Sequence, residues 1–161
     1  MTIHLLYGPV GCGKTTLAKR LERELPAVRF THDEWMVSLH GSNPPCAGFQ
    51  EEADRIWDLI WKEAARALKS GRDVVLDGGF WSRASRDDAR RRAAALGAGW
   101  RLYWITCPEP VARQRVLQRT AEMQAGTLCI DGPTIDLLNR RVESLQPGEE
   151  HIVVSPSTTE V

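Results

Sequence analysis

Apolar and polar residues follow two kinds of pattern along this chain of 161 residues. Short, mostly apolar runs favour buried strands, and they occur at Thr2–Tyr7, Val28–Thr31, Asp73–Asp77, Trp100–Thr106 and His151–Val154. Longer segments favour helices, and they cover Gly13–Leu25, Gln50–Ser70, Ser82–Leu96, Pro108–Met123 and Pro133–Leu145. Because strands and helices alternate, the pattern predicts an α/β fold with a parallel sheet covered on both faces.

The segment Gln50–Ser70 has the clearest helical pattern. Its apolar residues recur every three or four positions and form one stripe: Ala53, Ile56, Trp57, Ile60, Trp61, Ala64, Ala65 and Leu68. Charged residues occupy the other faces, so the two tryptophans are expected in the core rather than on a ligand. Before this helix, His40–Gly48 contains Asn43-Pro44-Pro45 and two glycines, which predicts a loop.

Length and composition bound the organisation of the chain. We expect a single domain over residues 1–154 and a loose polar tail over 155–161. The 21 Lys and Arg residues balance the 21 Asp and Glu residues, which argues against a dedicated duplex-DNA binder but leaves a local basic patch open. The N-terminus enters a strand rather than a signal peptide, and no apolar run is long enough to span a bilayer.

The redox state of the cysteines and the oligomeric state are two further expectations. Four cysteines are scattered without metal-binding spacing, at Cys12, Cys46, Cys107 and Cys129. They are therefore expected to be reduced thiols in a cytoplasmic protein. Both a monomer and a dimer are compatible with the sequence.

Residues Gly8–Thr15 read GPVGCGKT, a full match to the phosphate-binding loop pattern GxxxxGK[ST], between a predicted strand and a predicted helix. Backbone N–H groups of such a loop bind phosphate oxygens, and its glycines allow close approach. Lys14 adds positive charge at the β and γ phosphates, and Thr15 offers a hydroxyl to Mg²⁺. The loop predicts triphosphate contacts from Gly8, Gly11, Cys12, Gly13, Lys14, Thr15 and Thr16, with the Cys12 thiol as a spectator.

Two acids follow predicted strands and are candidates for chemistry. Asp77 ends the apolar run Val74–Leu76, the Walker B arrangement, which predicts a magnesium ligand; the alternative is a turn acid before Gly78. Asp33 follows the second strand, where it could accept a proton from a substrate hydroxyl. Glu34 competes for this role, and both acids could instead favour the start of a helix.

Arginines form the third candidate group. Arg83 and Arg86 follow the Walker B strand. Arg113, Arg115 and Arg119 lie on the predicted helix Pro108–Met123, where Arg115 and Arg119 are four residues apart and share a face. An arginine closing over the γ-phosphate would neutralise the charge that develops during phosphoryl transfer. Arg119, near the end of that helix, is a credible lid residue, and Arg90–Arg92 is expected to form a solvated face.

These pieces together resemble the small P-loop kinase group that includes zeta toxins, polynucleotide kinases and chloramphenicol phosphotransferase, all AAA-type ATP-binding proteins. The residues that carry the resemblance are Gly8–Thr16, Asp33, Val74–Arg83 and Cys107–Arg119, and it extends to about Leu145. It implies a three-layer P-loop fold with a five-stranded parallel sheet in the order 2-3-1-4-5. It also implies ATP and Mg²⁺ on Lys14 and Thr15, Asp33 as base, and Arg115 or Arg119 in the lid.

The leading hypothesis is an ATP-dependent kinase that phosphorylates a hydroxyl of a small molecule. An acceptor pocket formed by Trp35, Phe80 and Trp81, with Arg83 nearby, is one reading; core packing of the aromatics is the other. Polynucleotide kinases often have a short polar stretch where this chain has Gly78–Trp81, so a 5′-hydroxyl nucleic-acid kinase is the less favoured alternative. A switch protein that hydrolyses ATP without an acceptor is the third possibility.

Overall fold

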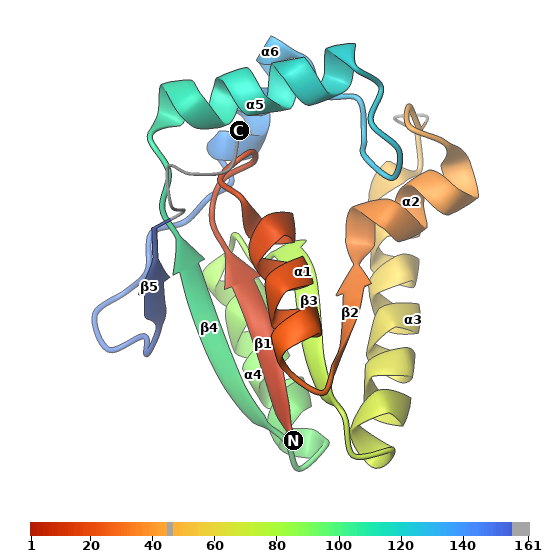
Figure 1. The fold of residues 1–161 in the computed structure, drawn as a ribbon, viewed down its shortest axis with the longest axis vertical. Coiled ribbons are helices and arrows are strands. Elements are labelled where there is room, and N and C mark those ends of the chain that lie inside the picture. Colours follow the sequence, from red (N-terminus) through yellow and green to blue (C-terminus); the bar gives the residue numbers. More distant parts are fainter. Residues whose placement is uncertain (45–46, 156–161) are drawn as a thin grey trace.

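The computed structural model describes residues 1–44 and 47–155, and its centre is a five-stranded parallel sheet (Figure 1). The strands are β1 (Thr2–Tyr7), β2 (Ala27–Thr31), β3 (Asp73–Gly79), β4 (Gly99–Ile105) and β5 (Ile152–Val154). They lie in the order β2-β3-β1-β4-β5, which confirms the predicted order. The helices are α1 (Lys14–Glu24), α2 (His32–His40), α3 (Phe49–Lys69), α4 (Arg83–Ala95), α5 (Glu109–Ala121) and α6 (Gly132–Asn139).

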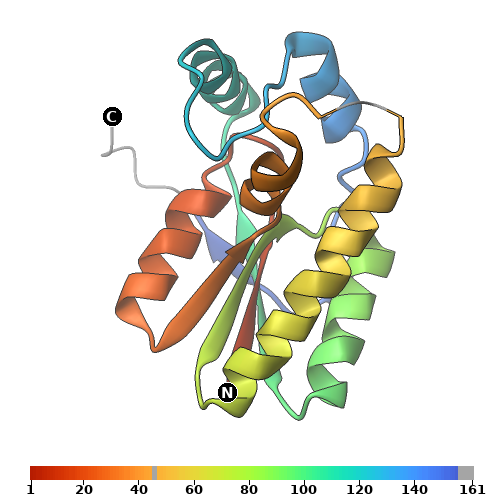
Figure 2. The same ribbon diagram turned by 90° about the vertical axis from the view of Figure 1, so that its right-hand side faces the viewer.

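Helices cover both faces of the sheet, as Figure 2 shows, with α1 on one face and α3 and α4 on the other. Alternation along the strands sets this arrangement, because successive side chains point to opposite faces. In β1, Leu5 packs with the cluster under α3 and α4, whereas Leu6 packs with the cluster under α1. The three-layer P-loop fold predicted from the sequence is therefore confirmed.

Parallel strands bring three loops together at one edge of the sheet. Leu5 of β1 pairs with Leu76 of β3 and with Leu102 of β4, so the segments that follow these strands emerge side by side. The helices α2, α5 and α6 gather at this carboxyl edge (Figure 1). A crevice at the carboxyl ends of strands is where α/β proteins bind their ligands.

Most predicted elements are correct to within two residues, and two regions differ. Residues His32–His40 form α2, which packs on α3. The apolar pattern did not predict this helix, but the alternative reading of Asp33 and Glu34 as acids at the start of a helix is confirmed. The predicted helix Pro133–Leu145 ends at Asn139, because the following segment instead packs against α4 through a buried ion pair described below. Strand β3 also continues two residues further, to Gly79.

Some predictions fall partly outside the described residues. Pro45 of the predicted Asn43–Pro45 loop and Cys46 lie outside them, as do residues 156–161 of the predicted tail. Within the ranges 1–44 and 47–155, no helix has the length and hydropathy that a membrane span requires.

Candidate functional site

The phosphate loop connects β1 to α1, and its lysine is already oriented by the loop itself. The Lys14 ammonium donates to the Gly8 carbonyl at 2.9 Å and to the Pro9 carbonyl at 2.6 Å. An ammonium has three N–H donors. Two of them are used by these carbonyls, and the third has only a weak contact with Cys12 Sγ, at 3.9 Å, which a phosphate oxygen can replace. α1 begins at Lys14, so its N-terminal N–H groups add favourable charge for an anion at the loop.

Gly11 allows α5 to pack directly on the phosphate loop. Its φ is +75°, and a Cβ at this position would collide with the Ala112 carbonyl and approach Val116 at 2.8 Å. Val10 and Val116 belong to one buried cluster, which fastens α5 to the loop. Next to Gly11, the Cys12 side chain is fully buried and burial raises the pKa of its thiol, which agrees with a spectator role.

Thr15 and Asp77 meet, as the Walker A and Walker B interpretation requires. The Thr15 hydroxyl donates to Oδ2 of Asp77 at 2.6 Å. Magnesium takes six oxygen ligands at about 2.1 Å, so two neighbouring ligands of one ion lie about 3 Å apart. This pair of hard oxygens fits Mg²⁺, with water and phosphate oxygens as the other ligands. Within the described residues, no group of three His, Cys, Asp or Glu side chains forms a separate metal site.

Asp77 lies at the centre of a charged network. It is only 5% exposed, and this burial raises the pKa of its carboxyl, while the Thr15 hydrogen bond and Lys14 lower it. The charge of Asp33 raises it further, so the two candidate acids interact electrostatically. The Thr31 hydroxyl also donates to Asp77 at 3.5 Å, and Arg29 donates to Thr31. Thr31 and Arg29 were not among the predicted site residues.

The structure separates Asp33 from Glu34, which the sequence left as competitors. Both lie in the first turn of α2. Glu34 forms an ion pair with Arg29 at 2.9 Å, so its carboxylate is engaged. The Asp33 side chain is 51% exposed, and the only ion-pair partner within reach in the described chain is His32, at 3.8 Å. Asp33 is therefore the acid of this pair that is available to a substrate.

The three aromatic residues proposed for an acceptor pocket have different neighbours. Trp35 packs edge-on to Phe30 with ring centroids 6.4 Å apart, and Trp81 donates from its indole to the phosphate loop. Phe80 is buried and packs on Trp57 at 5.3 Å. Trp35 therefore lies with the core around Phe30, whereas Trp81 lies on the phosphate loop, and an acceptor pocket formed by these aromatic residues stays a prediction.

Trp57, which the sequence assigned to the core stripe, is only partly buried. Its ring stacks on His32 at 5.2 Å and touches Gly78 so closely that a Cβ there would overlap it. The Nε2–H of His32 donates to the Ala53 carbonyl, which holds the stack. Trp57 therefore contacts the residue before Asp33 and the residue after Asp77. The apolar stripe could not reveal these contacts, because it predicts which face of the helix is buried but not which residues that face contacts.

The candidate arginines Arg119, Arg115 and Arg83 differ in burial and in hydrogen-bond partners. Arg119 lies seven residues after Ala112, nearly two turns, so it shares the face of α5 that packs on the loop. Its Nε is shielded from solvent and has no hydrogen-bond partner in the described part of the chain. Arg115 is exposed, with Cys107 Sγ 4.0 Å from its Nη1. Arg83 forms an ion pair with Asp87 at 2.7 Å.

The Arg90–Arg92 run is paired with acids, and it is not the wholly solvated face that the sequence predicted. Arg91 bridges to Asp88 on the exposed surface. Arg90 is only 15% exposed, pairs with Glu149 and lies over the Trp100 ring. One end of this run therefore belongs to the packing of α4 rather than to a solvated face.

Arg86, which the sequence placed with Arg83 among the candidate arginines, is the largest fully buried side chain of the described residues. Its guanidinium forms two hydrogen bonds with Glu149, at 2.9 and 3.0 Å, and packs over the Tyr7 ring. It also donates to the Phe80 and Trp81 carbonyls. Arg86 thus joins the turn after β3 to the segment between α6 and β5.

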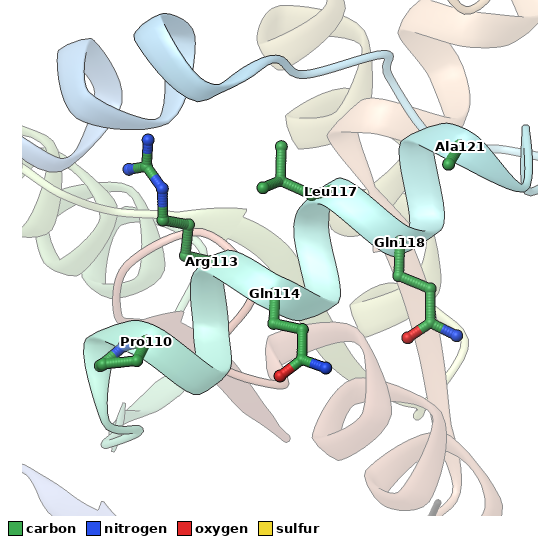
Figure 3. Close-up of a pocket in the computed structure, with 6 residues that line it drawn as sticks. All are labelled: Pro110, Arg113, Gln114, Leu117, Gln118 and Ala121. Atoms are coloured by element: carbon green, nitrogen blue, oxygen red, sulfur yellow. The ribbon is translucent and has the colours of Figure 1, made fainter.

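A hollow of the surface lies along α5 (Figure 3). It has a volume of about 670 Å³, and its lining comes from one helix: Pro110, Arg113, Gln114, Leu117, Gln118 and Ala121. The face that touches Gly11 carries Ala112 and Val116 instead. This hollow is therefore separate from the triphosphate site.

The fold is shared with many solved structures. Kti12 from Chaetomium thermophilum, solved with ADP-AlF3, superimposes with a TM-score of 0.76 at 16% identity, covering 96% of this chain and 89% of that protein. A gluconokinase from Sinorhizobium meliloti 1021 gives 0.61 at 16% identity, covering 97% and 83%. A sugar kinase from Janibacter sp. HTCC2649 gives 0.63 at 16% identity, covering 96% and 84%.

Sequence comparison identifies the family. No curated protein matches the chain. The family described as "AAA domain" matches residues 3–131, which include the phosphate loop, Asp33, Asp77 and all of α5. Since this match covers most of the chain, and the fold is that of small P-loop kinases, the protein belongs to the AAA domain family of P-loop nucleotide-binding proteins.

Proposed function

We propose that the protein is an ATP-dependent kinase that transfers the γ-phosphate to a hydroxyl group of a small molecule. The observation that carries the proposal is the position of Asp33. Its exposed carboxylate lies in the first turn of α2, at the edge of the sheet where the phosphate loop lies. Its negative charge raises the pKa of the Asp77 carboxyl. A phosphate loop alone holds a donor, whereas a free carboxylate at this edge supplies a base for an acceptor.

The donor side uses residues of the loop and of β3. Lys14 would contact the β and γ phosphates, and Thr15 and Asp77 would hold Mg²⁺, which neutralises the charge of the phosphates when bound. The backbone from Gly8 to Thr16 would supply N–H donors. ATP rather than GTP follows from the resemblance to P-loop kinases.

On the acceptor side, Asp33 would accept the proton of the attacking hydroxyl. The new bond forms between the hydroxyl oxygen and the γ-phosphorus, the bond from the γ-phosphorus to the bridging oxygen breaks, and ADP leaves. The unpartnered Nε of Arg119 faces the loop side of α5, so we assign the transition-state arginine to Arg119 rather than Arg115.

Trp57 would form one wall of the acceptor site. Its contacts with His32 and Gly78 put it beside the backbone that carries both acids. An aromatic ring face suits the C–H face of a sugar or another ring compound. This favours a small cyclic alcohol as acceptor over a nucleic-acid end, for which a basic channel would be expected.

An acceptor screen tests the proposal. ADP formation from ATP is measured with polyols, sugars, aminocyclitols and 5′-hydroxyl oligonucleotides, using wild type, Asp33→Asn and the control Asp54→Asn. Asp54 is an exposed acid of α3 that contacts Gln50. Acceptor-dependent turnover that is lost only in Asp33→Asn supports the proposal. Transfer to oligonucleotides alone selects a nucleic-acid kinase, and turnover unaffected by any acceptor selects an ATP-hydrolysing switch.

A further inference from the structure

The indole of Trp81 lies against the phosphate loop rather than in a pocket for a substrate. Its Nε1–H donates to the Gly8 carbonyl at 2.8 Å. The same carbonyl accepts the Lys14 ammonium at 2.9 Å, and that ammonium lies 5.9 Å from the centre of the Trp81 ring. The Trp81 side chain, 73 residues after Gly8 in the sequence, therefore contacts both the first residue of the loop and its lysine.

The backbone at the end of β3 turns so that Trp81 reaches the phosphate loop. Gly79 has a φ of +88° and Phe80 a φ of +43°, so two consecutive residues adopt left-handed conformations. Such a conformation is uncommon for a residue as bulky as phenylalanine, so the surrounding structure must hold it in place. A Cβ at Gly79 would lie 2.9 Å from Nε1 of Trp81, so the turn has room for the indole only because residue 79 is a glycine.

Hydrogen bonds from α4 and from the segment after α6 also hold this turn. The Trp81 carbonyl accepts a hydrogen bond from Arg86 at 2.9 Å and another from the Glu143 N–H at 3.0 Å. Arg86 is itself fixed by its pairing with Glu149. The backbone of Trp81 is thus held by groups outside the phosphate loop, and these contacts do not depend on the indole's own hydrogen bond to the loop.

We propose that Trp81 is a positioning residue of the phosphate loop. By holding the Gly8 carbonyl, it keeps the acceptor that orients Lys14 in place, so that the remaining N–H of the ammonium points to the phosphates. Preorganised donors bind a charge without a reorganisation cost. This inference rests on the nucleotide binding within the proposed function and is independent of the acceptor. Core packing alone would not require the indole N–H.

The test separates the N–H from the ring. Trp81→Phe keeps an aromatic ring but removes the donor, and Trp81→Leu removes both. Trp104→Phe is the matched control, because Trp104 lies on β4 and contacts His151. Affinities for Mg-ATP and Mg-ADP are measured by calorimetry on the full chain. One hydrogen bond corresponds to roughly a two- to tenfold weaker Kd in Trp81→Phe, with a larger loss in Trp81→Leu.

A spectroscopic readout accompanies the affinities, since a purely structural residue would not respond to nucleotide. The six tryptophans give six indole N–H signals, and the signal absent from Trp81→Phe identifies Trp81. We expect this signal to shift when Mg-ADP binds to the wild type. It remains available even if Trp81→Leu does not fold.

Three results would overturn the inference, and they differ in what they mean for the kinase proposal. If the wild type binds nucleotide and Trp81→Phe binds it as tightly as Trp104→Phe does, Trp81 is not a positioning residue, and the kinase proposal stands. An unmoved Trp81 signal in the nucleotide complex leads to the same conclusion. If the wild type binds no nucleotide, the proposed function fails and the inference fails with it.

Discussion

Replacing Arg86 by methionine is expected to destabilise the fold by about 3–5 kcal/mol, the usual cost of removing one partner of a buried ion pair. The Arg86 side chain is 0% exposed and that of Glu149 is 1% exposed, so solvent cannot take over the lost contacts. The substitution leaves the Glu149 carboxylate with Arg90, with the Gln146 N–H and with the more distant Arg83, at 3.8 Å. It also removes a donor from the Phe80 and Trp81 carbonyls.

The assay is urea denaturation followed by circular dichroism, with Arg91→Met as the control. Arg91 lies on the same helix and also bridges an acid, Asp88, but its side chain is 76% exposed. Such a surface pair contributes about 0–1 kcal/mol. Equal losses of unfolding free energy in the two variants would refute the reasoning that burial makes Arg86 different.

The same ion pair predicts a pH dependence. Hydrogen bonds from Arg86 hold the pKa of Glu149 well below its ordinary value of 4.5. A lowered carboxyl pKa stabilises the fold above the unfolded value, and this stabilisation is lost as the pH falls below it. The difference in unfolding free energy between wild type and Glu149→Gln should therefore be constant near neutral pH and shrink below about pH 4.5. A difference that grows on acidification would contradict the assignment.

Three further predictions concern the nucleotide site. Asp77→Asn and Thr15→Val should each weaken nucleotide binding on the order of tenfold or more in the presence of Mg²⁺, with little effect in EDTA, as titration calorimetry would show. Gly11→Ala should destabilise the protein by about 1–3 kcal/mol in thermal unfolding and weaken nucleotide binding, because its Cβ would push Ala112 and α5 off the loop; an unchanged Tm would contradict this. Arg119→Ala should lower kcat roughly 10²- to 10³-fold, whereas Arg115→Ala should lower it less than about tenfold; the reverse order in steady-state kinetics would transfer the role to Arg115.

The parts of the fold that could be predicted are those with a local signal. The apolar stripe of α3 and the apolar runs of the strands reflect burial on one face or two, and strand order followed from the resemblance to P-loop kinases. The pairing of Thr15 with Asp77 was also predictable, because a Walker A loop and a Walker B strand end at one sheet edge. Helix α2 has a weak apolar pattern, with only His32 and Met36 buried, so periodicity did not reveal it.

The rest of the site depends on partners far apart in the sequence. Arg86 meets Glu149 across 63 residues, and Trp81 meets Gly8 across 73. Neither residue carries a pattern that names its partner: Arg86 is one of several arginines in α4, and Trp81 follows a glycine pair. Asp33 and Glu34 are adjacent acids that the sequence could not rank as candidate bases. The structure distinguishes them, because Glu34 forms an ion pair with Arg29 of β2.

The fate of the γ-phosphate tests the central claim most directly. ATP labelled in its γ-phosphate is incubated with Mg²⁺, the protein and the acceptor found in the screen, and the products are resolved by phosphorus NMR and mass spectrometry. The account predicts labelled phosphate in an ester with an alcohol oxygen of the acceptor, formed by the wild type and not by Asp33→Asn. Label recovered only as inorganic phosphate, in equal amounts with and without acceptor, would contradict it.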